Sequence, residues 1–252
     1  MRKAYRMKRN YLAAKITKTA KEAALLLFPT RCPVCDGVVK RKEGLICTGC
    51  RNGFKTVTEP FCLSCGKPLS AESSQYCNDC AGKPHKYIRG RALYEYESAA
   101  ASIYRFKYGG RREYARFFGR EIAGCLEKFI RKAAPDALIP VPLSRKRLSR
   151  RGYNQAQLLA EVIGEEMGIP VYPHLAVRVR DTLPQKELNA QERQNNLKRA
   201  FKMIENDVKL STIIIIDDIY TTGSTIDALA EVFLQTGVKK VYFVALAVGN
   251  RG

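Results

Sequence analysis

The segment spanning residues 213–225 constrains the fold of this chain more than any other part of it. It opens with four consecutive isoleucines, which are typical of a strand buried on both faces of a parallel sheet. We expect this strand to end at two adjacent carboxylates, Asp217 and Asp218. A short loop rich in hydroxyl groups follows, and an apolar pattern of helical period begins at Ile226. The segment therefore predicts a buried strand, a tight loop and a helix in immediate succession.

The loop of this segment has the composition of an anion site. Backbone N–H groups at a helix start, together with the positive end of the helix dipole, attract phosphate. Gly223 lets the backbone approach closely, and its neighbours offer hydroxyl donors: Thr221, Thr222, Ser224 and Thr225. The loop lacks the lysine of a nucleoside-triphosphate P-loop. Because two adjacent carboxylates can accept hydrogen bonds from a diol, a phosphate monoester beside a sugar fits best. The alternative is a set of residues that only cap the helix.

The segment resembles the signature of the type I phosphoribosyltransferases, which bind 5-phosphoribosyl-1-pyrophosphate (PRPP). Every position of that pattern is filled here. The resemblance implies that Asp217 and Asp218 hold the ribose hydroxyls and that magnesium accompanies the pyrophosphate. It assigns the 5-phosphate to the loop residues Thr221, Thr222, Gly223, Ser224 and Thr225.

Eight of the nine cysteines form four Cys-x-x-Cys pairs at equal spacing: Cys32/Cys35, Cys47/Cys50, Cys62/Cys65 and Cys77/Cys80. Two structural zinc sites, each built from four thiolates, are the direct interpretation. An iron–sulfur cluster and disulfides are the alternatives. Since disulfides need an oxidising compartment and no secretory signal precedes the cysteines, we expect zinc and a cytoplasmic protein.

The equal spacing leaves the zinc pairing open between successive ribbons and a cross-braced arrangement. We favour successive ribbons, because each then begins with a glycine-bearing knuckle. Only about 50 residues carry this module, so zinc supplies most of its folding energy. Replacing Cys62 with serine is therefore expected to unfold the module and to spare the rest of the chain. Cys125 stands apart among apolar neighbours, where we expect a small core residue.

A formal charge of +20 favours polyanionic partners. The first 21 residues hold eight Lys or Arg and no acid, and a helix is expected from about residue 11 to residue 27. This basic segment is interpreted as a nucleic-acid arm, a membrane-surface anchor or a solvated face. No run approaches the roughly 18–20 apolar residues that cross a membrane, so no transmembrane segment is expected.

Strand and helix signals alternate through the rest of the chain. A strand or hairpin is expected at residues 87–96, and strands at 137–143, 171–179, 213–216 and 240–248. Helices are expected at 98–108, at 113–132, from after residue 154 to about 167, and from 226 onward. This alternation predicts an α/β fold with a mainly parallel sheet flanked by helices. We divide the chain into a basic helical segment (1–29), a double zinc-ribbon module (30–84) and a phosphoribosyltransferase-like domain (85–252). His85 and His174 are isolated in the sequence, and nothing marks either as a base.

Three further segments narrow the resemblance: residues 106–110 (FKYGG), 140–155 (PVPLSRKRLSRRGYNQ), and 182–185 with 191–195. Together with the zinc knuckles and the PRPP signature, they are similar to the ComF family of DNA-uptake proteins. The resemblance implies a pyrophosphate-binding loop at Leu143, Ser144, Arg145, Lys146 and Arg147, for which a basic surface turn is the alternative. It also implies a flexible hood at 181–195, with Gln185 and Arg193 as candidates.

Two functions follow. We favour a ComF-like protein that binds PRPP and acts in DNA uptake, with single-stranded DNA and other DNA-uptake proteins as partners. The alternative is a magnesium-dependent phosphoribosyltransferase that acts on an unidentified nitrogen acceptor, independent of DNA, and whether the chain is an enzyme stays open. Aromatic and basic residues interleave at 104–108 and 114–118. These stretches either stack nucleic-acid bases or form the apolar faces of helices.

Overall fold

The computed structural model describes residues 29–40, 42, 44–70, 74–179, 200–204 and 207–249. The chain divides into two compact units, between Arg51 and Asn52. The first unit carries one group of four cysteines and the 3₁₀ helix η1 (Thr48–Cys50). The second carries the other four cysteines and the α/β fold. The boundaries at residues 29 and 84 divide the chain by motif and stay a prediction. The expected helix at residues 11–27 lies outside the described residues.

A parallel sheet forms the centre of the second unit. Its strand order is β1-β6-β5-β2, and all three pairings are parallel. The strands are β1 (Arg89–Glu95), β2 (Ala137–Pro140), β5 (Thr212–Tyr220) and β6 (Lys240–Val248). A parallel bridge between Leu138 and Val171 continues the sheet beyond β2. The expected strand at 171–179 is therefore only a bridge at its start. Its end forms β3 (Ala176–Arg178), which pairs with the unpredicted β4 (Phe201–Met203).

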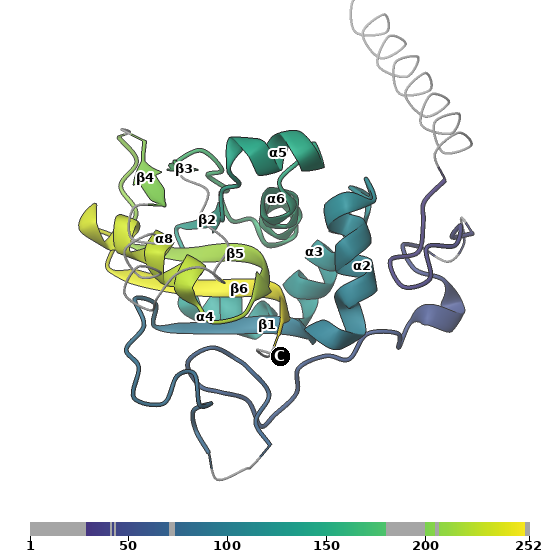
Figure 1. Ribbon diagram of the computed structural model, residues 1–252, viewed down its shortest axis with the longest axis horizontal. Helices are drawn as coiled ribbons and strands as arrows, with labels where there is room; N and C mark the ends of the chain where they lie inside the picture. The colour runs from purple at the N-terminus through teal and green to yellow at the C-terminus, as the bar shows by residue number, and fades with distance from the viewer. Residues whose placement is uncertain are drawn as a thin grey trace, which may run out of the picture. The chain divides into compact units, whose positions relative to one another are not determined.

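Helices flank this sheet, which confirms the predicted fold class (Figure 1). They are α2 (Tyr96–Tyr108), α3 (Tyr114–Cys125), α4 (Glu127–Ala133), α5 (Arg145–Arg151), α6 (Gln155–Met167) and α8 (Ser224–Gln235). The single helix expected at 113–132 is interrupted at Leu126, which leaves the helical region at φ −104° and ψ 12°. Cys125 is the last residue of α3 and is exposed, so its expected place in the core is wrong.

The four isoleucines of β5 are all fully buried, because helices cover both faces of the sheet. Ile213 and Ile215 belong to one apolar cluster with Leu229 of α8. Successive side chains of a strand point to opposite faces, so the alternate isoleucines face the other side. On β6, Tyr242 likewise meets Phe129 of α4, with ring centroids 6.2 Å apart. The unbroken apolar run thus reflects a strand between two helical layers.

The central strand continues past its two carboxylates. We expected it to end at Asp217 and Asp218, but β5 extends to Tyr220. The reason is its partner strand, since Asp217 pairs with Ala245 and Tyr220 pairs with Val248 of β6. The two carboxylates therefore lie on a paired strand and not on a free loop.

The second cysteine group packs against the sheet. Cys62, Cys65 and Cys80 belong to the same buried cluster as the core residues of β5, β6 and α8. The knuckle after Cys62 also contacts β1 directly, where the Gly90 N–H donates to the Ser64 carbonyl at 2.8 Å. Loss of this knuckle would uncover part of the α/β core. This packing argues against the expectation that a Cys62 replacement spares the α/β domain, which stays a prediction.

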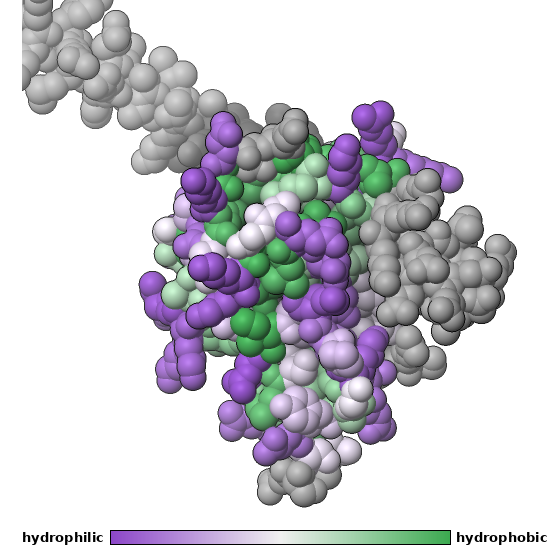
Figure 2. Space-filling model, turned by 90° about the vertical axis from the view of Figure 1, so that its left-hand side faces the viewer, coloured by the Kyte–Doolittle hydropathy of each residue, from purple (hydrophilic) through white to green (hydrophobic). Residues whose placement is uncertain are grey.

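Apolar residues reach the surface on the side of the molecule that carries β4, where Figure 2 shows hydrophobic groups among hydrophilic ones. The segments that form and follow β3 and β4 expose four aliphatic side chains: Val177, Val179, Ile204 and Val208. Within the described ranges, every helix is too short or too polar to cross a lipid bilayer.

Candidate functional site

The loop after β5 leads directly into α8. Gly223 holds φ +78°, a left-handed conformation that favours glycine, and it immediately precedes the first helical residue. Gly223 stands at the cap position and has no side chain, so among the described residues the N–H groups of the helix start lack a capping acceptor at that position. Within the loop, the hydroxyls of Thr222 and Ser224 lie 2.8 Å apart. This geometry suits a small anion, which would accept hydrogen bonds from the helix start.

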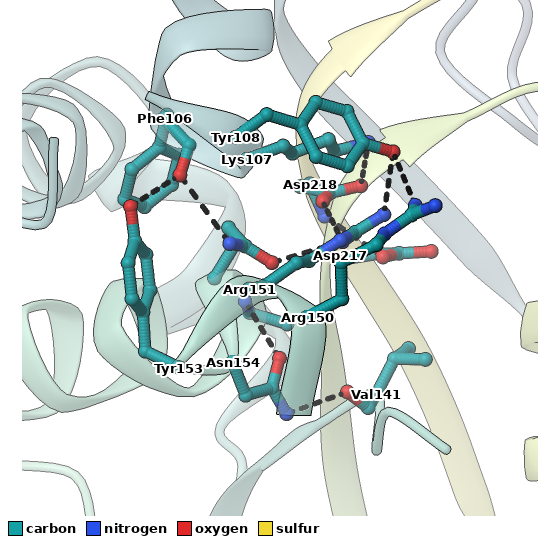
Figure 3. Close-up of polar contacts among 12 residues, drawn as sticks. Phe106, Lys107, Tyr108, Val141, Arg150, Arg151, Tyr153, Asn154, Asp217 and Asp218 are labelled. Carbon is teal, nitrogen blue, oxygen red and sulfur yellow. Dashed lines mark hydrogen bonds and ion pairs between the residues drawn. The ribbon is translucent and has the colours of Figure 1, made fainter. Parts of the chain in front are cut away.

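Asp218 forms ion pairs with two basic side chains from other elements (Figure 3). Lys107, near the end of α2, places its Nζ 2.9 Å from Asp218 Oδ1. Arg151, at the end of α5, places its Nη1 3.9 Å from Asp218 Oδ2. From the sequence, the segments that contain these two residues were interpreted as family markers and as basic stretches suited to nucleic acid, and neither residue was assigned to the PRPP site. Their basic character was the available signal, but nothing in the sequence pairs them with an aspartate.

A buried hydrogen-bond network holds these segments together (Figure 3). The carbonyl of Phe106 accepts from the hydroxyl of Tyr153 at 2.6 Å and from Nε2 of Gln155 at 3.3 Å. Asn154 donates from Nδ2 to the Val141 carbonyl at 3.0 Å. The segment between α5 and α6 is thereby fixed both to α2 and to the end of β2. Such a network positions Lys107 and Arg151 beside the carboxylates.

The electrostatics of this region shift two pKa values. Burial, followed by the charge of Asp218, raises the pKa of Asp217 to about 7. Burial alone would raise the pKa of Tyr108, but the hydrogen bond from Arg151 and nearby positive charges lower it below its ordinary value. The hydroxyl of Tyr108 accepts from Arg151 Nη2 at 3.1 Å. The site thus combines an acidic pair with a positively charged rim.

The expected pyrophosphate loop is partly helical. Ser144 is buried and caps α5, with its Oγ accepting from the Arg147 N–H at 3.4 Å. Arg145, Lys146 and Arg147 form the first turn of that helix. Leu143 to Lys146 line a cavity of about 670 Å³ together with His174. The expected hood, with Gln185 and Arg193, lies outside the described residues.

The eight paired cysteines form two groups, Cys32, Cys35, Cys47 and Cys50, and Cys62, Cys65, Cys77 and Cys80. The successive arrangement favoured from the sequence is therefore confirmed. In each group the four sulfur atoms lie within 4.8 Å of one another.

These sulfur positions fit zinc. Tetrahedral Zn–S bonds of about 2.3 Å place sulfurs about 3.8 Å apart. Cys35 and Cys47 are separated by 3.5 Å, and Cys65 and Cys77 by 3.6 Å. The described cysteines are all free thiols, so neither group forms the alternative disulfides. The hydrogen bond with Cys62, followed by burial, raises the pKa of the Cys65 thiol and so disfavours its thiolate form. A bound divalent cation would stabilise that thiolate. Zinc would act there structurally.

His85 is a residue that sequence reasoning missed. Its side chain is buried and bonds from Nδ1 to Asp227 Oδ2 of α8 at 2.9 Å. Its Nε2 lies 3.4 Å from the sulfur of Cys80. His85 is isolated in the sequence, but the fold brings it into contact with both Cys80 and Asp227.

Comparison with known proteins identifies two family models and several relatives that match this chain. A family model described as a double zinc ribbon domain matches residues 23–81, and a phosphoribosyl transferase domain model matches residues 149–252. Competence protein F of Haemophilus influenzae is 31% identical over 230 residues, which cover 87% of this chain and 97% of that protein. The chain belongs to the ComF family.

Other relatives extend the ComF assignment. DNA utilization protein YhgH of Escherichia coli is 30% identical over 223 residues, with 86% of this chain and 96% of that protein covered. Competence protein ComFC of Bacillus subtilis is 30% identical over 202 residues, with 76% of this chain and 79% of that protein covered. The ComF resemblance drawn from the sequence motifs is thus confirmed. The phosphoribosyl transferase model includes both Asp217 and the loop that follows β5.

Proposed function

We propose that this ComF-family protein binds PRPP at Asp217, Asp218 and the loop before α8, and that it acts in DNA uptake. One observation carries the proposal of PRPP binding. An acidic pair and an uncapped helix start follow one another at the carboxyl end of a central parallel strand, with Lys107 and Arg151 beside them. Ligands of parallel α/β sheets bind at this edge.

Each part of PRPP has a matching group. The carboxylates of Asp217 and Asp218 would accept from the ribose hydroxyls, and residues 221–225 would bind the 5-phosphate. Arg145, Lys146 and Arg147 offer three positive charges for the pyrophosphate, which would carry magnesium. The hood candidates Gln185 and Arg193 would close over the bound ligand. Lys107 and Arg151 are added to this set because they contact Asp218.

Single-stranded DNA is the partner that the surface favours. The relatives carry names that refer to competence and to DNA utilization, and this chain has a net charge of +20. Phe106, Phe117 and Phe118 are buried, as expected for the apolar faces of helices. Tyr104 and Tyr108, in contrast, are 65% and 45% exposed.

These two tyrosines form a small aromatic platform. Their ring centroids lie 5.1 Å apart, and the guanidinium groups of Arg150 and Arg151 lie 5.1 and 5.0 Å from the Tyr108 ring. Exposed rings beside arginines suit the stacking of bases and the binding of a phosphate backbone. We therefore place part of the DNA path across α2 and α5. Reduced, zinc-binding thiols favour a cytoplasmic location, where other DNA-uptake proteins would be partners.

Calorimetry with PRPP and magnesium tests the ligand. We expect the wild-type chain to bind PRPP and the double variant Asp217→Asn with Asp218→Asn to bind it at least tenfold more weakly. This direction is informative, because removing negative charge would by itself favour an anion. The double variant Glu161→Gln with Glu165→Gln removes the same charge from exposed positions on α6 and serves as the control. Equal or tighter binding by the aspartate variant would contradict the site.

A binding assay with single-stranded DNA tests the partner. Tyr104→Ala removes an exposed ring and should weaken binding by about 1–3 kcal/mol if a base stacks there. Tyr104→Phe keeps the ring and should bind as the wild type does. Equal affinity of both variants would remove this platform from the DNA path. Pyrophosphate released from PRPP only when a nitrogen acceptor is present, without any DNA binding, would favour the enzymatic alternative.

A further inference from the structure

His85 lies between the second cysteine group and the loop that we assign to the 5-phosphate. Its side chain is only 3% exposed, and its ring stacks on Tyr87 with centroids 4.6 Å apart and an interplanar angle of 18°. One ring nitrogen lies 3.4 Å from the Cys80 sulfur, and the other lies 2.9 Å from the Asp227 carboxylate. The imidazole therefore contacts a zinc-binding residue on one side and α8 on the other.

Asp227 receives two hydrogen bonds from the segment that follows the second cysteine group. Because a carboxylate only accepts hydrogen bonds, His85 donates to it from Nδ1. The backbone N–H of Lys86 donates to the other carboxylate oxygen at 2.8 Å. Asp227 itself donates its N–H to the carbonyl of Gly223 at 2.7 Å. The first turn of α8 is thus held by residues 85 and 86.

The loop also rests directly on this histidine. A Cβ atom placed on Gly223 would lie 3.2 Å from His85 Cε1 and 2.7 Å from the hydroxyl of Tyr220. That hydroxyl lies 2.7 Å from the hydroxyl of Tyr87, whose ring stacks on His85. His85 and Tyr220 therefore form the floor beneath the loop. Both connect it to the region of the second cysteine group.

We propose that His85 is a positioning residue that couples zinc binding at the second cysteine group to the order of the 221–225 loop. Groups that hydrogen-bond to metal ligands commonly orient those ligands, and here the same group also orients an anion loop. Zinc at this group would fix Cys80 and the segment up to Lys86, and this segment in turn holds Asp227. A loop ordered in advance binds its ligand more tightly, because less conformational entropy is lost on binding.

The proposal predicts that the two zinc sites differ in their effect on the 221–225 loop. The first group belongs to the other compact unit, whereas the second packs in the α/β core. Loss of the second zinc should loosen the loop and weaken PRPP binding, and loss of the first should do neither. The effect on PRPP rests on the proposed function, but the effect on the loop does not.

The test uses His85→Phe in the full chain, which keeps a ring against Tyr87 and removes both nitrogen atoms. We expect two zinc ions per chain by elemental analysis, at least tenfold faster hydrogen exchange of the amides at 221–227, and PRPP affinity lowered on the order of tenfold. His174→Phe, at the other histidine, is the matched control for zinc content and for loop exchange and should change neither; PRPP affinity is not compared in this variant, because His174 lines the cavity beside the proposed pyrophosphate loop. Cys80→Ser should reproduce the faster exchange with one zinc lost, and Cys32→Ser should lose one zinc without it.

Unchanged loop exchange in His85→Phe with both zinc ions present would overturn the proposal. If this variant loses zinc or fails to fold, Asp227→Ala decides the matter, since it removes both acceptor oxygens of the carboxylate and leaves the Cys80 contact of His85 in place. Faster exchange at 221–227 in Asp227→Ala supports the coupling, and wild-type exchange overturns it. A wild-type chain that holds two zinc ions but does not bind PRPP would refute the proposed function, while the exchange comparison would still decide the coupling.

Discussion

Lys107 Nζ lies 2.9 Å from Asp218 Oδ1, and the two side chains are only 14% and 13% exposed. A partly buried lysine thereby balances one of two adjacent carboxylates in the free protein. Without it, less positive charge would offset the carboxylate of Asp218 beside the loop that we assign to a phosphate. The lysine on α2 thus makes an acidic strand end compatible with an anionic ligand.

Lys107→Met should weaken PRPP binding on the order of tenfold, which corresponds to about 1.4 kcal/mol. The substitution removes the nearest cation from Asp218 and raises the negative potential at the site. Calorimetry with magnesium and PRPP measures the change. Lys128→Met removes the same charge from an exposed position on α4 and should bind PRPP as the wild type does. Equal affinities for the two variants would show that Lys107 does not serve the ligand.

The pKa of Asp217, raised from 3.8 to about 7, predicts a pH-dependent stability. Between these values the folded chain holds a proton that the unfolded chain has released. The free energy of unfolding therefore falls as pH rises from about 4 to about 7. Asp217→Asn cannot titrate and lacks this fall.

Melting temperatures of both proteins at pH 5 and pH 8 check this prediction. The wild type should lose several degrees relative to Asp217→Asn between the two conditions. Zinc-binding thiols also respond to pH, but they are common to both proteins and cancel in the difference. A difference that stays constant would mean that Asp217 is already ionised at pH 5.

Gly223→Ala should impair the loop through two separate effects. The left-handed φ of +78° costs an alanine about 1 kcal/mol, and the added methyl group would lie 2.7 Å from the Tyr220 hydroxyl. Gly168→Ala is a suitable control, since its φ is +70° with nothing within 4 Å of the new methyl group. Denaturant titration should show the larger loss for Gly223→Ala, and PRPP binding should fall only in that variant. Equal losses of stability would show that the loop adapts to the methyl group.

Deletion of residues 1–20 should change the salt dependence of DNA binding. The deleted segment carries seven Lys or Arg residues and no acid. Log affinity for a single strand should fall with log salt concentration by about 0.7 per phosphate contact. The slope should become shallower after deletion if the segment contacts DNA, while PRPP binding should persist. A slope that does not change would leave this segment as a solvated basic face.

The sequence predicted those parts of the fold and site that depend on residues close together in the chain. The strand, loop and helix at 213–235 and the last strand follow from short-range apolar patterns, and the cysteine pairs follow from their spacing. The interruption at Leu126 was missed, because both halves of residues 113–132 favour helix. Strand β4 was missed because only three residues form it.

The contacts that could not be predicted join distant parts of the chain. His85 and Asp227 are 142 residues apart, and no local pattern links an isolated histidine to a carboxylate in a helix. Lys107 and Arg151 likewise meet Asp218 only because α2 and α5 end at the same edge of the sheet. Packing of Cys62 against the sheet was also missed, since the cysteine spacing reports the metal site and not its surroundings.

The strand order has a consequence for biosynthesis. β6 is the last strand in the chain, yet it lies between β1 and β5 in the sheet. Among the strands that the structure describes, β1 pairs in the sheet only with β6, so it lacks this partner until residues 240–248 have left the ribosome. Until β6 is made, the edges of β1 and β5 that will pair with it stay unpaired. Unpaired strand edges favour aggregation and binding by chaperones. A chain truncated before residue 240 would lack the strand that joins the two halves of the sheet.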